Sequence, residues 1–327
     1  MYQGKKMGDE YYCSSPFNSI FLDTHGDVSS CCAGVGRWGD SRQESLEDII
    51  HSQLAKNIRN DVKNGVVNSY CSRCHNIEKN QSPSQRTHFD YIDIDTSKDF
   101  ELKTLDVRWS NICNFSCIYC NEDFSSTWAK KKQINIPTGN LTNQDTLLEY
   151  IEKEGGGGIQ KIMMAGGEPL LQTQNNKLLD LVSIDTHITI ITNMGIDLSK
   201  SVIFKKLSKM PNIIWSISME NVNSQYEYIR QGGNWELLLN NIKYIKENTK
   251  HTINLLSVYN SLTIPLINDF IKFAEKNRLN IIWQPILNFE VMNPYTMKND
   301  IIKYYISVLE NVEHTDLIDY GKDFIKE

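Results

Sequence analysis

Three cysteines lie close together in the sequence, at Cys113, Cys117 and Cys120, with the spacing C-x3-C-x2-C. Three thiolates at this spacing can hold three irons of a four-iron, four-sulfur cluster. The fourth iron then has no protein ligand and is open to a substrate or cofactor, so the motif predicts a reaction centre. A structural zinc site is the alternative, although structural zinc prefers four protein ligands.

A second unusual motif consists of Gly166, Gly167, Glu168 and Pro169. Glycine has no Cβ, so this stretch of backbone can approach a ligand closely. The Glu168 carboxylate can accept hydrogen bonds from an ammonium group. The alternative is a simple turn from a strand to a helix, with Pro169 at the first helical position.

Short β-rich runs alternate with helical patterns from residue 104 onward. The expected strands are 105–109, 160–164, 187–192, 212–217, 252–258 and 280–285. The expected helices include 142–153, 174–183, 234–247, 265–276 and a closing helix at 298–312. Alternation of strands and helices predicts a parallel sheet, arranged as an open sheet or a partial barrel.

Polar residues follow or end each expected strand. The three cysteines follow the first strand and the glycine motif follows the second. The other positions are Thr192, Asn193, Ser216, Ser218, Glu220, Asn260 and Gln284. Ligands of parallel α/β folds bind at the carboxyl ends of the strands, so we expect these side chains to converge there.

The first hundred residues do not show this alternation of strands and helices. The runs 19–23 and 27–30 flank a short turn and predict a β-hairpin. Ser45 and Asp48 form a capping-box pattern, and a helical pattern then continues to Gly65, which predicts one helix. The apolar positions of this helix are Leu46, Ile49, Ile50, Leu54, Ile58 and Val62.

Composition limits the class of protein. The chain has 327 residues, of which 40% are hydrophobic, and a formal net charge of -6. The negative charge argues against broad binding to a phosphate backbone, so we expect no nucleic-acid partner. The sequence contains neither a run of about 18 apolar residues nor a signal-peptide pattern, so we expect no membrane partner and a cytoplasmic location.

All eight cysteines lie within the first 120 residues. In a reducing cytosol, such clustering indicates metal binding or catalysis rather than disulfides.

Together, the cysteine loop and the glycine motif resemble the radical S-adenosylmethionine superfamily. The resemblance depends on Cys113, Cys117 and Cys120, on Tyr119 before the last cysteine, and on the glycine motif one strand later. In that superfamily, the open iron of a [4Fe-4S] cluster binds the amine and carboxylate of the methionine part of S-adenosylmethionine. The resemblance implies that Glu168 and the glycine backbone bind the amine and that Tyr119 packs near the adenine.

The resemblance also implies further contacts to S-adenosylmethionine. Positions that commonly meet the ribose or methionine part correspond to Thr192, Asn193, Ser216 and Ser218, and a frequent carboxylate contact corresponds to Arg230. Ordinary strand residues at the two serines, and a solvated charge at the end of a helix for Arg230, are the alternatives. Family members often have aspartate where this chain has Glu220, so Glu220 is left unassigned.

The first hundred residues are similar to the auxiliary-cluster modules called SPASM and twitch. These modules usually follow the barrel, whereas here the module precedes it, as in N-terminal twitch enzymes. The resemblance implies one auxiliary [4Fe-4S] cluster, held by Cys13, Cys31, Cys71 and Cys74. A four-cysteine zinc site is the alternative. Cys32 is left over: it can replace Cys31 as a ligand, donate a hydrogen atom or, as our default, pack as a small hydrophobic residue.

The predicted fold is therefore α/β, a partial (β/α)6 TIM-like barrel preceded by a small hairpin-plus-helix iron–sulfur module. The expected domain limits are 1–80 for the auxiliary module, 81–103 for a linker and 104–327 for the barrel.

The resemblance implies reductive cleavage of S-adenosylmethionine to a 5′-deoxyadenosyl radical, which abstracts hydrogen from a peptide or a small, sugar-like molecule. An external low-potential donor such as a flavodoxin or ferredoxin would supply the electron for this cleavage. The auxiliary cluster would take part in electron transfer. A non-catalytic iron–sulfur electron carrier or redox sensor is the alternative. Such a carrier needs no amine-binding carboxylate, so Glu168 argues against it.

Overall fold

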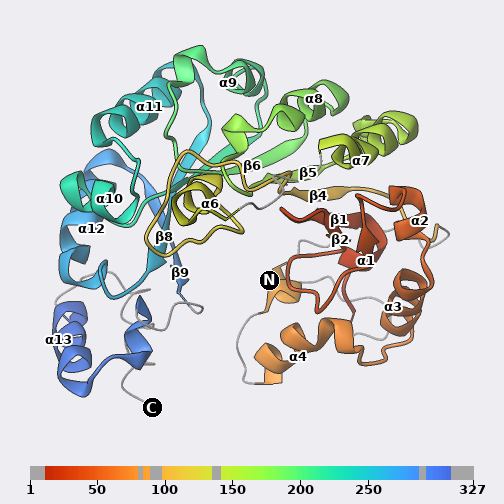
Figure 1. Ribbon diagram of the computed structural model, residues 1–327, viewed down its shortest axis with the longest axis horizontal. Helices are drawn as coiled ribbons and strands as arrows, with labels where there is room; N and C mark the ends of the chain where they lie inside the picture. The colour runs from red at the N-terminus through yellow and green to blue at the C-terminus, as the bar shows by residue number, and fades with distance from the viewer. Residues whose placement is uncertain (1–11, 80–83, 89–97, 135–140, 287–291, 311–327) are drawn as a thin grey trace.

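A nine-stranded sheet forms the centre of the molecule. The computed structural model describes residues 12–79, 84–88, 98–134, 141–286 and 292–310 (Figure 1). Within them the strand order is β3-β2-β1-β4-β5-β6-β7-β8-β9. The last six strands are β4 Thr104–Val107, β5 Lys161–Met164, β6 His187–Thr192, β7 Ile213–Ser218, β8 Thr252–Tyr259 and β9 Asn280–Pro285. They all run parallel, so the predicted parallel sheet is confirmed at all six positions.

Helices cover the outer side of the curved sheet (Figure 1). They are α7 Leu141–Glu154, α8 Thr173–Leu181, α9 Val202–Leu207, α10 Asn223–Ile229, α11 Trp235–Asn248 and α12 Ile267–Asn277, followed by α13 Asn299–Glu310. Strand residues on the helix side form the core: Leu105, Ile162 and Ile188 are at most 2% exposed. Strand residues alternate between faces, so the next residues, Asp106, Met163 and Thr189, lie on the inner side of the curve, and these three are partly buried.

The predicted N-terminal hairpin is confirmed. Strands β1 Ser19–Leu22 and β2 Asp27–Ser29 pair antiparallel, and β3 Gly39–Asp40 joins β2. Strand β1 also pairs in parallel with β4, with Ser19 opposite Thr104. The hairpin therefore extends the sheet of the barrel and does not form a separate sheet.

The single helix expected between Ser45 and Gly65 is wrong, because the structure has two helices there. They are α2 Leu46–Ile50 and α3 Gln53–Lys63. The Ser45 side chain caps α2, as predicted, but the Ser52 side chain accepts a hydrogen bond from the amide of Ala55 and begins a new helix. Ile58 and Val62 of α3 are buried as expected, whereas Leu54 is 47% exposed.

The segment that joins the module to the barrel is only partly described. Residues 80–83 and 89–97 of the expected boundary region lie outside the described residues. Before β4, the amides of Glu101 and Lys103 donate to the carbonyls of Phe17 and Asn18, so this stretch packs along the module. In the described parts of the chain, no helix is long and apolar enough to cross a membrane.

Candidate functional site

The three-cysteine loop follows β4, as expected, at the carboxyl edge of the sheet. Cys117 is 7% exposed, and Cys113 and Cys120 are partly buried. Burial raises the pKa of Cys113 to about 12 and that of Cys117 to about 11. The charges of Glu168, Cys117 and Cys120 raise the pKa of Cys113 further. Thiols whose pKa is raised in this way become thiolates only beside strong positive charge, as the irons of a cluster provide.

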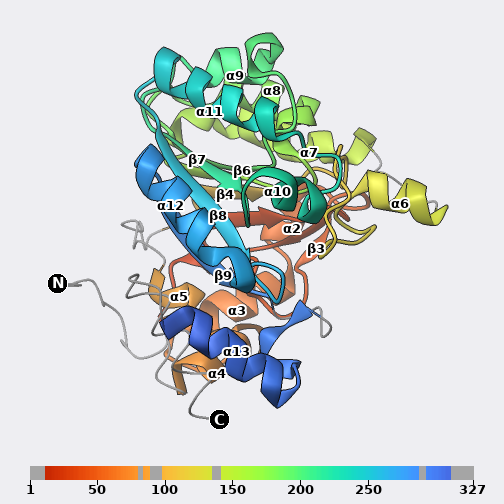
Figure 2. The same cartoon turned by 90° about the vertical axis from the view of Figure 1, so that its left-hand side faces the viewer.

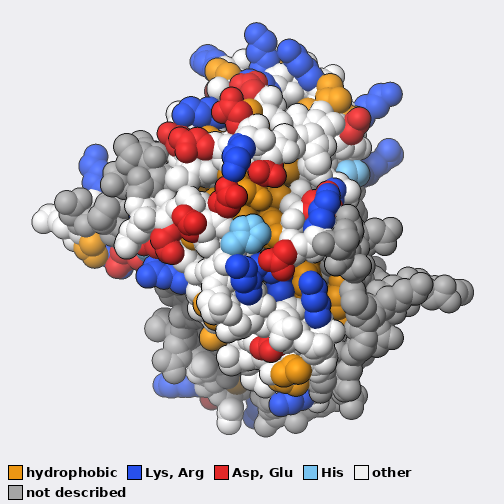
Figure 3. Space-filling view, turned by 90° about the vertical axis from the view of Figure 1, so that its right-hand side faces the viewer, with side chains coloured by type: hydrophobic (Ala, Val, Ile, Leu, Met, Phe, Trp, Pro, Cys, Tyr) orange, Lys and Arg blue, Asp and Glu red, His pale blue; other side chains and the backbone are white. Residues whose placement is uncertain are grey.

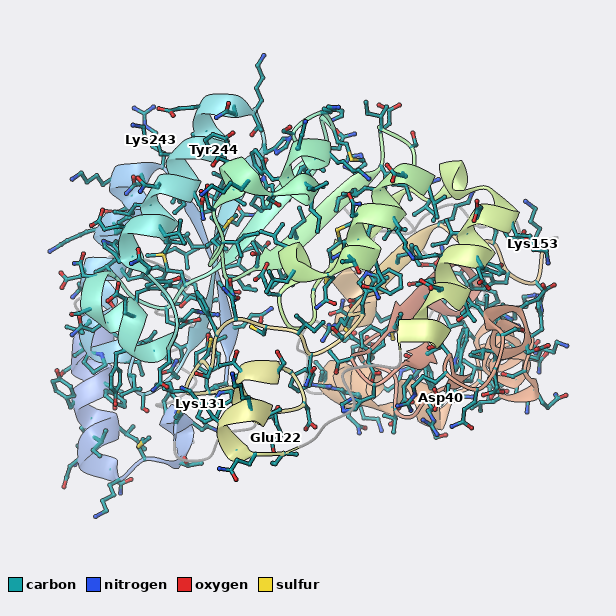
Figure 4. All side chains as sticks on the ribbon, turned by 45° about the horizontal axis from the view of Figure 1, so that its top comes forward. Asp40, Glu122, Lys131, Lys153, Lys243 and Tyr244 are labelled. Carbon is teal, nitrogen blue, oxygen red and sulfur yellow. The ribbon has the colours of Figure 1, made fainter. Side chains whose placement is uncertain are left out.

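Helix α6 Ser126–Lys132 fixes this loop and projects from the molecule beside it (Figure 2). Thr127 Oγ1 donates to the carbonyl of Cys113 at 2.7 Å, and Trp128 Nε1 donates to the carbonyl of Cys117 at 2.7 Å. Lys131, labelled in Figure 4, returns from the helix to donate to Ser116 Oγ at 2.6 Å. The segment after the cysteines therefore holds the backbone of the loop in place.

The glycine motif follows β5 and packs directly on the cysteine loop. The amide of Gly167 donates to the carbonyl of Ser110 at 3.1 Å, and the amide of Glu168 donates to the carbonyl of Ile112 at 2.8 Å. A Cβ on Gly167 would lie 2.2 Å from the Ile112 oxygen, and Gly166 has a φ of +114°. The close approach of the chain to itself therefore requires glycine here, and the contact of this backbone with a ligand stays a prediction.

Glu168 is fully buried and connects the ends of β5 and β6. Its carboxylate accepts hydrogen bonds from Thr192 Oγ1 at 2.7 Å, from the amide of Asn193 at 2.7 Å and from the amide of Leu170 at 3.0 Å. Burial raises the pKa of Glu168 to about 7, although these hydrogen bonds lower it. A carboxylate has about four lone-pair positions, so three donors leave room for one more.

Asn193 connects this region to the cysteine loop. Its Nδ2 lies 3.6 Å from Cys113 Sγ and 2.9 Å from Asn114 Oδ1. The predicted residues Glu168, Thr192 and Asn193 therefore meet beside one of the predicted cluster ligands.

The two predicted serines lie on β7. Ile214 of the same strand lines a cavity on the inner face of the sheet. Because strand residues alternate, Ser216 and Ser218 lie on this inner face too, and they are 5% and 9% exposed. Asn260, in contrast, closes the turn after β8 by donating to the carbonyl of Val258 at 2.8 Å.

Arg230 and Tyr119 meet in a buried cluster around Glu220, the residue that sequence reasoning left unassigned. Glu220 accepts from Tyr119 Oη at 2.6 Å and from Arg230 Nε and Nη2 at 2.8 and 2.5 Å. Arg230 Nη1 lies 3.7 Å from Cys117 Sγ. Arg230 is 7% exposed, which rules out the solvated charge considered as its alternative. The sequence does contain a signal for the role of Glu220: it is a carboxylate at the end of an expected strand, three residues before the helix that leads to Arg230.

The four cysteines expected at an auxiliary cluster surround one small cavity. Its lining includes Cys13, Cys31, Cys71 and Cys74, together with Tyr70 and Arg86. Cys13 precedes α1 Ser15–Asn18, Cys31 follows β2, Cys71 ends the short helix Ser69–Cys71, and Cys74 lies on α4 Ser72–Lys79. Burial and the neighbouring thiols raise the pKa of Cys71 to about 12.

A larger cavity, of about 380 Å³, lies on the inner face of the sheet. Cys32 lines this cavity and not the small one. The two cavities have a common wall made of Ser30, Cys31 and Gln85. Across the described residues, no three His, Cys, Asp or Glu side chains converge as ligands of a single metal ion. A cluster does not require such convergence, because each thiolate binds a different iron.

Two family models match the chain. The model described as "Radical SAM superfamily" matches residues 107–274. A second model, SPASM, is described as "Iron-sulfur cluster-binding domain" and matches residues 13–75. The first match contains the cysteine loop and strands β5 to β8, and the second contains all four cysteines of the small cavity.

Two curated relatives each match part of this chain. A 7-carboxy-7-deazaguanine synthase of Clostridium acetobutylicum is 27% identical over 53% of this chain and 84% of its own length. A probable GTP 3′,8-cyclase of Methanococcus maripaludis is 28% identical over 42% of this chain. The chain spans only 43% of the length of that cyclase.

Two solved structures resemble this chain at low sequence identity. The structure described as native anSMEcpe with bound AdoMet and Kp18Cys peptide is 18% identical, covers 67% of this chain and 62% of its own, and has a TM-score of 0.47. Streptococcus suis SuiB bound to S-adenosylmethionine is 13% identical, covers 96% of this chain and 69% of its own, and has a TM-score of 0.43.

Proposed function

The chain belongs to the radical S-adenosylmethionine superfamily, and from this premise we propose that Cys113, Cys117 and Cys120 hold its [4Fe-4S] cluster. The protein is a radical S-adenosylmethionine enzyme with an auxiliary iron–sulfur SPASM domain. When bound, the cluster and S-adenosylmethionine supply a one-electron cleavage that yields methionine and a 5′-deoxyadenosyl radical able to remove a hydrogen atom from an unactivated C–H bond. The protein positions the reactants and excludes water.

We assign the binding of S-adenosylmethionine to residues around the cysteine loop. Glu168, with its remaining lone-pair position, and the backbone of Gly166, Gly167 and Pro169 would bind the methionine amine. Arg230 would bind the carboxylate, and Tyr119 would pack near the adenine. The other contacts in this proposal are Thr192, Asn193, Ser216 and Ser218. Hydrogen bonds that join Glu168, Thr192 and Asn193 beside Cys113 support the assignment.

The wall between the two cavities supports a proposal that the substrate binds next to the auxiliary cluster. Cys31 faces both cavities, so a substrate in the larger one would lie next to a ligand of the auxiliary cluster. We assign Cys13, Cys31, Cys71 and Cys74 as the four ligands. A cluster with four protein ligands has no open iron, so its role would be to accept or supply an electron and not to bind substrate.

The proposed substrate is a peptide or a small, sugar-like molecule in the cavity on the inner face. A volume of about 380 Å³ is in the usual range for small-molecule sites. Asp106 lines this cavity and is paired with Arg108 at 3.3 Å, which provides charges for a polar substrate. Two relatives are named for a deazaguanine product and for GTP, so GTP belongs among the first small molecules to test.

The proposed partner is an external low-potential electron donor such as a flavodoxin or ferredoxin. Acidic and basic side chains are interspersed on the face in Figure 3, and a net charge of -6 gives no support for a nucleic-acid partner. We also propose that the protein is located in the cytoplasm. The proposed domain limits are 1–80 for the auxiliary module, 81–103 for the linker and 104–327 for the barrel.

Anaerobic reconstitution with iron and sulfide tests the proposal. We expect about eight irons per chain, as two [4Fe-4S] clusters require. Reduced protein with S-adenosylmethionine should release 5′-deoxyadenosine slowly without substrate, and faster with a substrate or a close analogue. About four irons would contradict the auxiliary assignment, whereas full iron content without 5′-deoxyadenosine would favour the electron-carrier alternative.

A further inference from the structure

A buried carboxylate outside the proposed set of S-adenosylmethionine contacts lies beside the cysteine loop. Glu220 follows β7 and is 1% exposed. It accepts hydrogen bonds from Tyr119 and from two nitrogens of Arg230, all within 2.8 Å, and the amide of Val258 lies 3.5 Å away. A charge buried this deeply is stable only if it is paired and hydrogen-bonded, so Glu220 and Arg230 form one unit.

We propose that Glu220 is a positioning residue that holds Arg230 beside Cys117 to receive the methionine carboxylate of S-adenosylmethionine. This inference rests on the function proposed above and adds a residue to its site. Glu220 does not touch the cofactor in this account; it acts through Arg230 and Tyr119.

The pairing fixes the direction of the guanidinium group. Nε and Nη2 lie on the same edge of arginine, and both donate to the two oxygens of Glu220. Two parallel hydrogen bonds define the plane of the guanidinium, which a single contact would not. The opposite nitrogen, Nη1, is then held 3.7 Å from Cys117 Sγ. Since Nη1 carries two hydrogens, donation to the sulfur leaves one N–H for a carboxylate next to Cys117.

The backbone is already fixed without Glu220. The amide of Ser116 donates to the carbonyl of Gln231 at 2.8 Å, and the amide of Ile118 donates to the carbonyl of Ile229 at 3.0 Å. These bonds lie on both sides of Cys117 and Arg230, so they hold the two chain segments together. The orientation of the Arg230 side chain is what remains for Glu220 to determine.

Glu220 also joins two of the proposed contacts. Tyr119, the proposed neighbour of the adenine, donates to the same oxygen as Arg230 Nη2. The guanidinium carbon of Arg230 lies 5.4 Å from the centre of the Tyr119 ring. One carboxylate thus sets the relative position of groups proposed for opposite ends of S-adenosylmethionine.

Binding measurements on the anaerobically reconstituted enzyme test the proposal with two ligands. S-adenosylmethionine carries the carboxylate, and decarboxylated S-adenosylmethionine lacks only that group. Glu220→Gln removes the charge and places an amide against the guanidinium. We expect this variant to weaken binding of S-adenosylmethionine about tenfold and to change binding of the decarboxylated ligand by less than about twofold. Glu122→Gln, at a partly exposed partner of Lys132 near the same loop, is the matched control and should change neither.

Equal weakening of both ligands would show a merely structural role and would overturn the proposal, as would unchanged binding of both. Glu220→Asp keeps the charge but is one methylene shorter, and we expect a loss of about threefold for S-adenosylmethionine alone. If Glu220→Gln fails to retain its iron, the binding of the two ligands to Glu220→Asp tests the positioning role instead. Failure of the proposed function is distinguishable, since the wild-type protein would then bind no S-adenosylmethionine.

Discussion

Asn193 Nδ2 lies 3.6 Å from the sulfur of Cys113, so an amide at the end of β6 donates toward a ligand of the proposed cluster. Hydrogen bonds to cluster sulfurs are among the factors that set reduction potential. They stabilise the more negative, reduced form. We therefore expect Asn193→Ala to make the midpoint potential of this cluster more negative.

A redox titration followed by electron paramagnetic resonance checks this prediction. Asn212→Ala is the matched control, because the Asn212 amide donates to the carbonyl of Asp185 far from the cysteine loop. An equal potential in wild-type protein and Asn193→Ala would show that the contact has no electrostatic effect on the cluster.

Gly167 should not tolerate a larger residue. A Cβ there would lie 2.2 Å from the carbonyl oxygen of Ile112, and backbone on both sides must shift to relieve the overlap. We expect Gly167→Ala to lower the free energy of unfolding by about 1–3 kcal/mol and to reduce the iron content. Gly157→Ala, where a Cβ meets nothing within 4 Å, should stay within about 0.5 kcal/mol of wild type. Denaturant unfolding and iron analysis measure both, and equal stability of the two variants would be inconsistent with the tight contact.

Glu168 should make stability fall as pH rises toward neutrality. Burial raises the pKa of Glu168 from 4.5 to about 7 in the folded protein. Between these values the folded state keeps a proton that the unfolded state has lost, so the free energy of unfolding decreases with increasing pH. The full effect is about 3 kcal/mol, and Glu168→Gln should lack it. Thermal unfolding between pH 5 and 8 compares the two proteins, and parallel pH profiles would refute the shift.

Cys31 and Cys32 should behave differently although they are neighbours. Cys31 lines the small cavity with the three other proposed ligands, whereas Cys32 lines only the larger one. We expect Cys31→Ala to lose about four irons and Cys32→Ala to keep the full content. Iron analysis after reconstitution distinguishes the two, and the opposite pattern would make Cys32 the ligand.

The strand positions of the barrel could be predicted because each strand is a short apolar run between helical patterns. The pairing of β1 with β4 could not, since Ser19 and Thr104 lie far apart in the sequence and no local pattern specifies their pairing. Serines within a helical pattern are ambiguous for a related reason. Ser52 fits the interior of one long helix as well as the cap of a new one, and packing decides between them.

At the site, too, local sequence motifs could be predicted, whereas contacts between distant segments could not. The spacing of the three cysteines and the glycine motif identified the loops that meet at the edge of the sheet. The pairing of Glu220 with Arg230 and Tyr119 depends on the relative rotation of three separate segments, so the sequence contained the residues but not their contact. The exclusion of Cys32 from the small cavity also depends on tertiary structure.

The most direct test of the account compares wild-type protein with a variant in which Cys113, Cys117 and Cys120 are all changed to alanine. Both are reconstituted anaerobically, reduced and incubated with S-adenosylmethionine, and 5′-deoxyadenosine is measured by chromatography. The account predicts 5′-deoxyadenosine from the wild type and none from the variant. The variant should still bind about four irons, which belong to the auxiliary cluster. Equal amounts of 5′-deoxyadenosine from both proteins would contradict the assignment of the cysteine loop as the reaction centre.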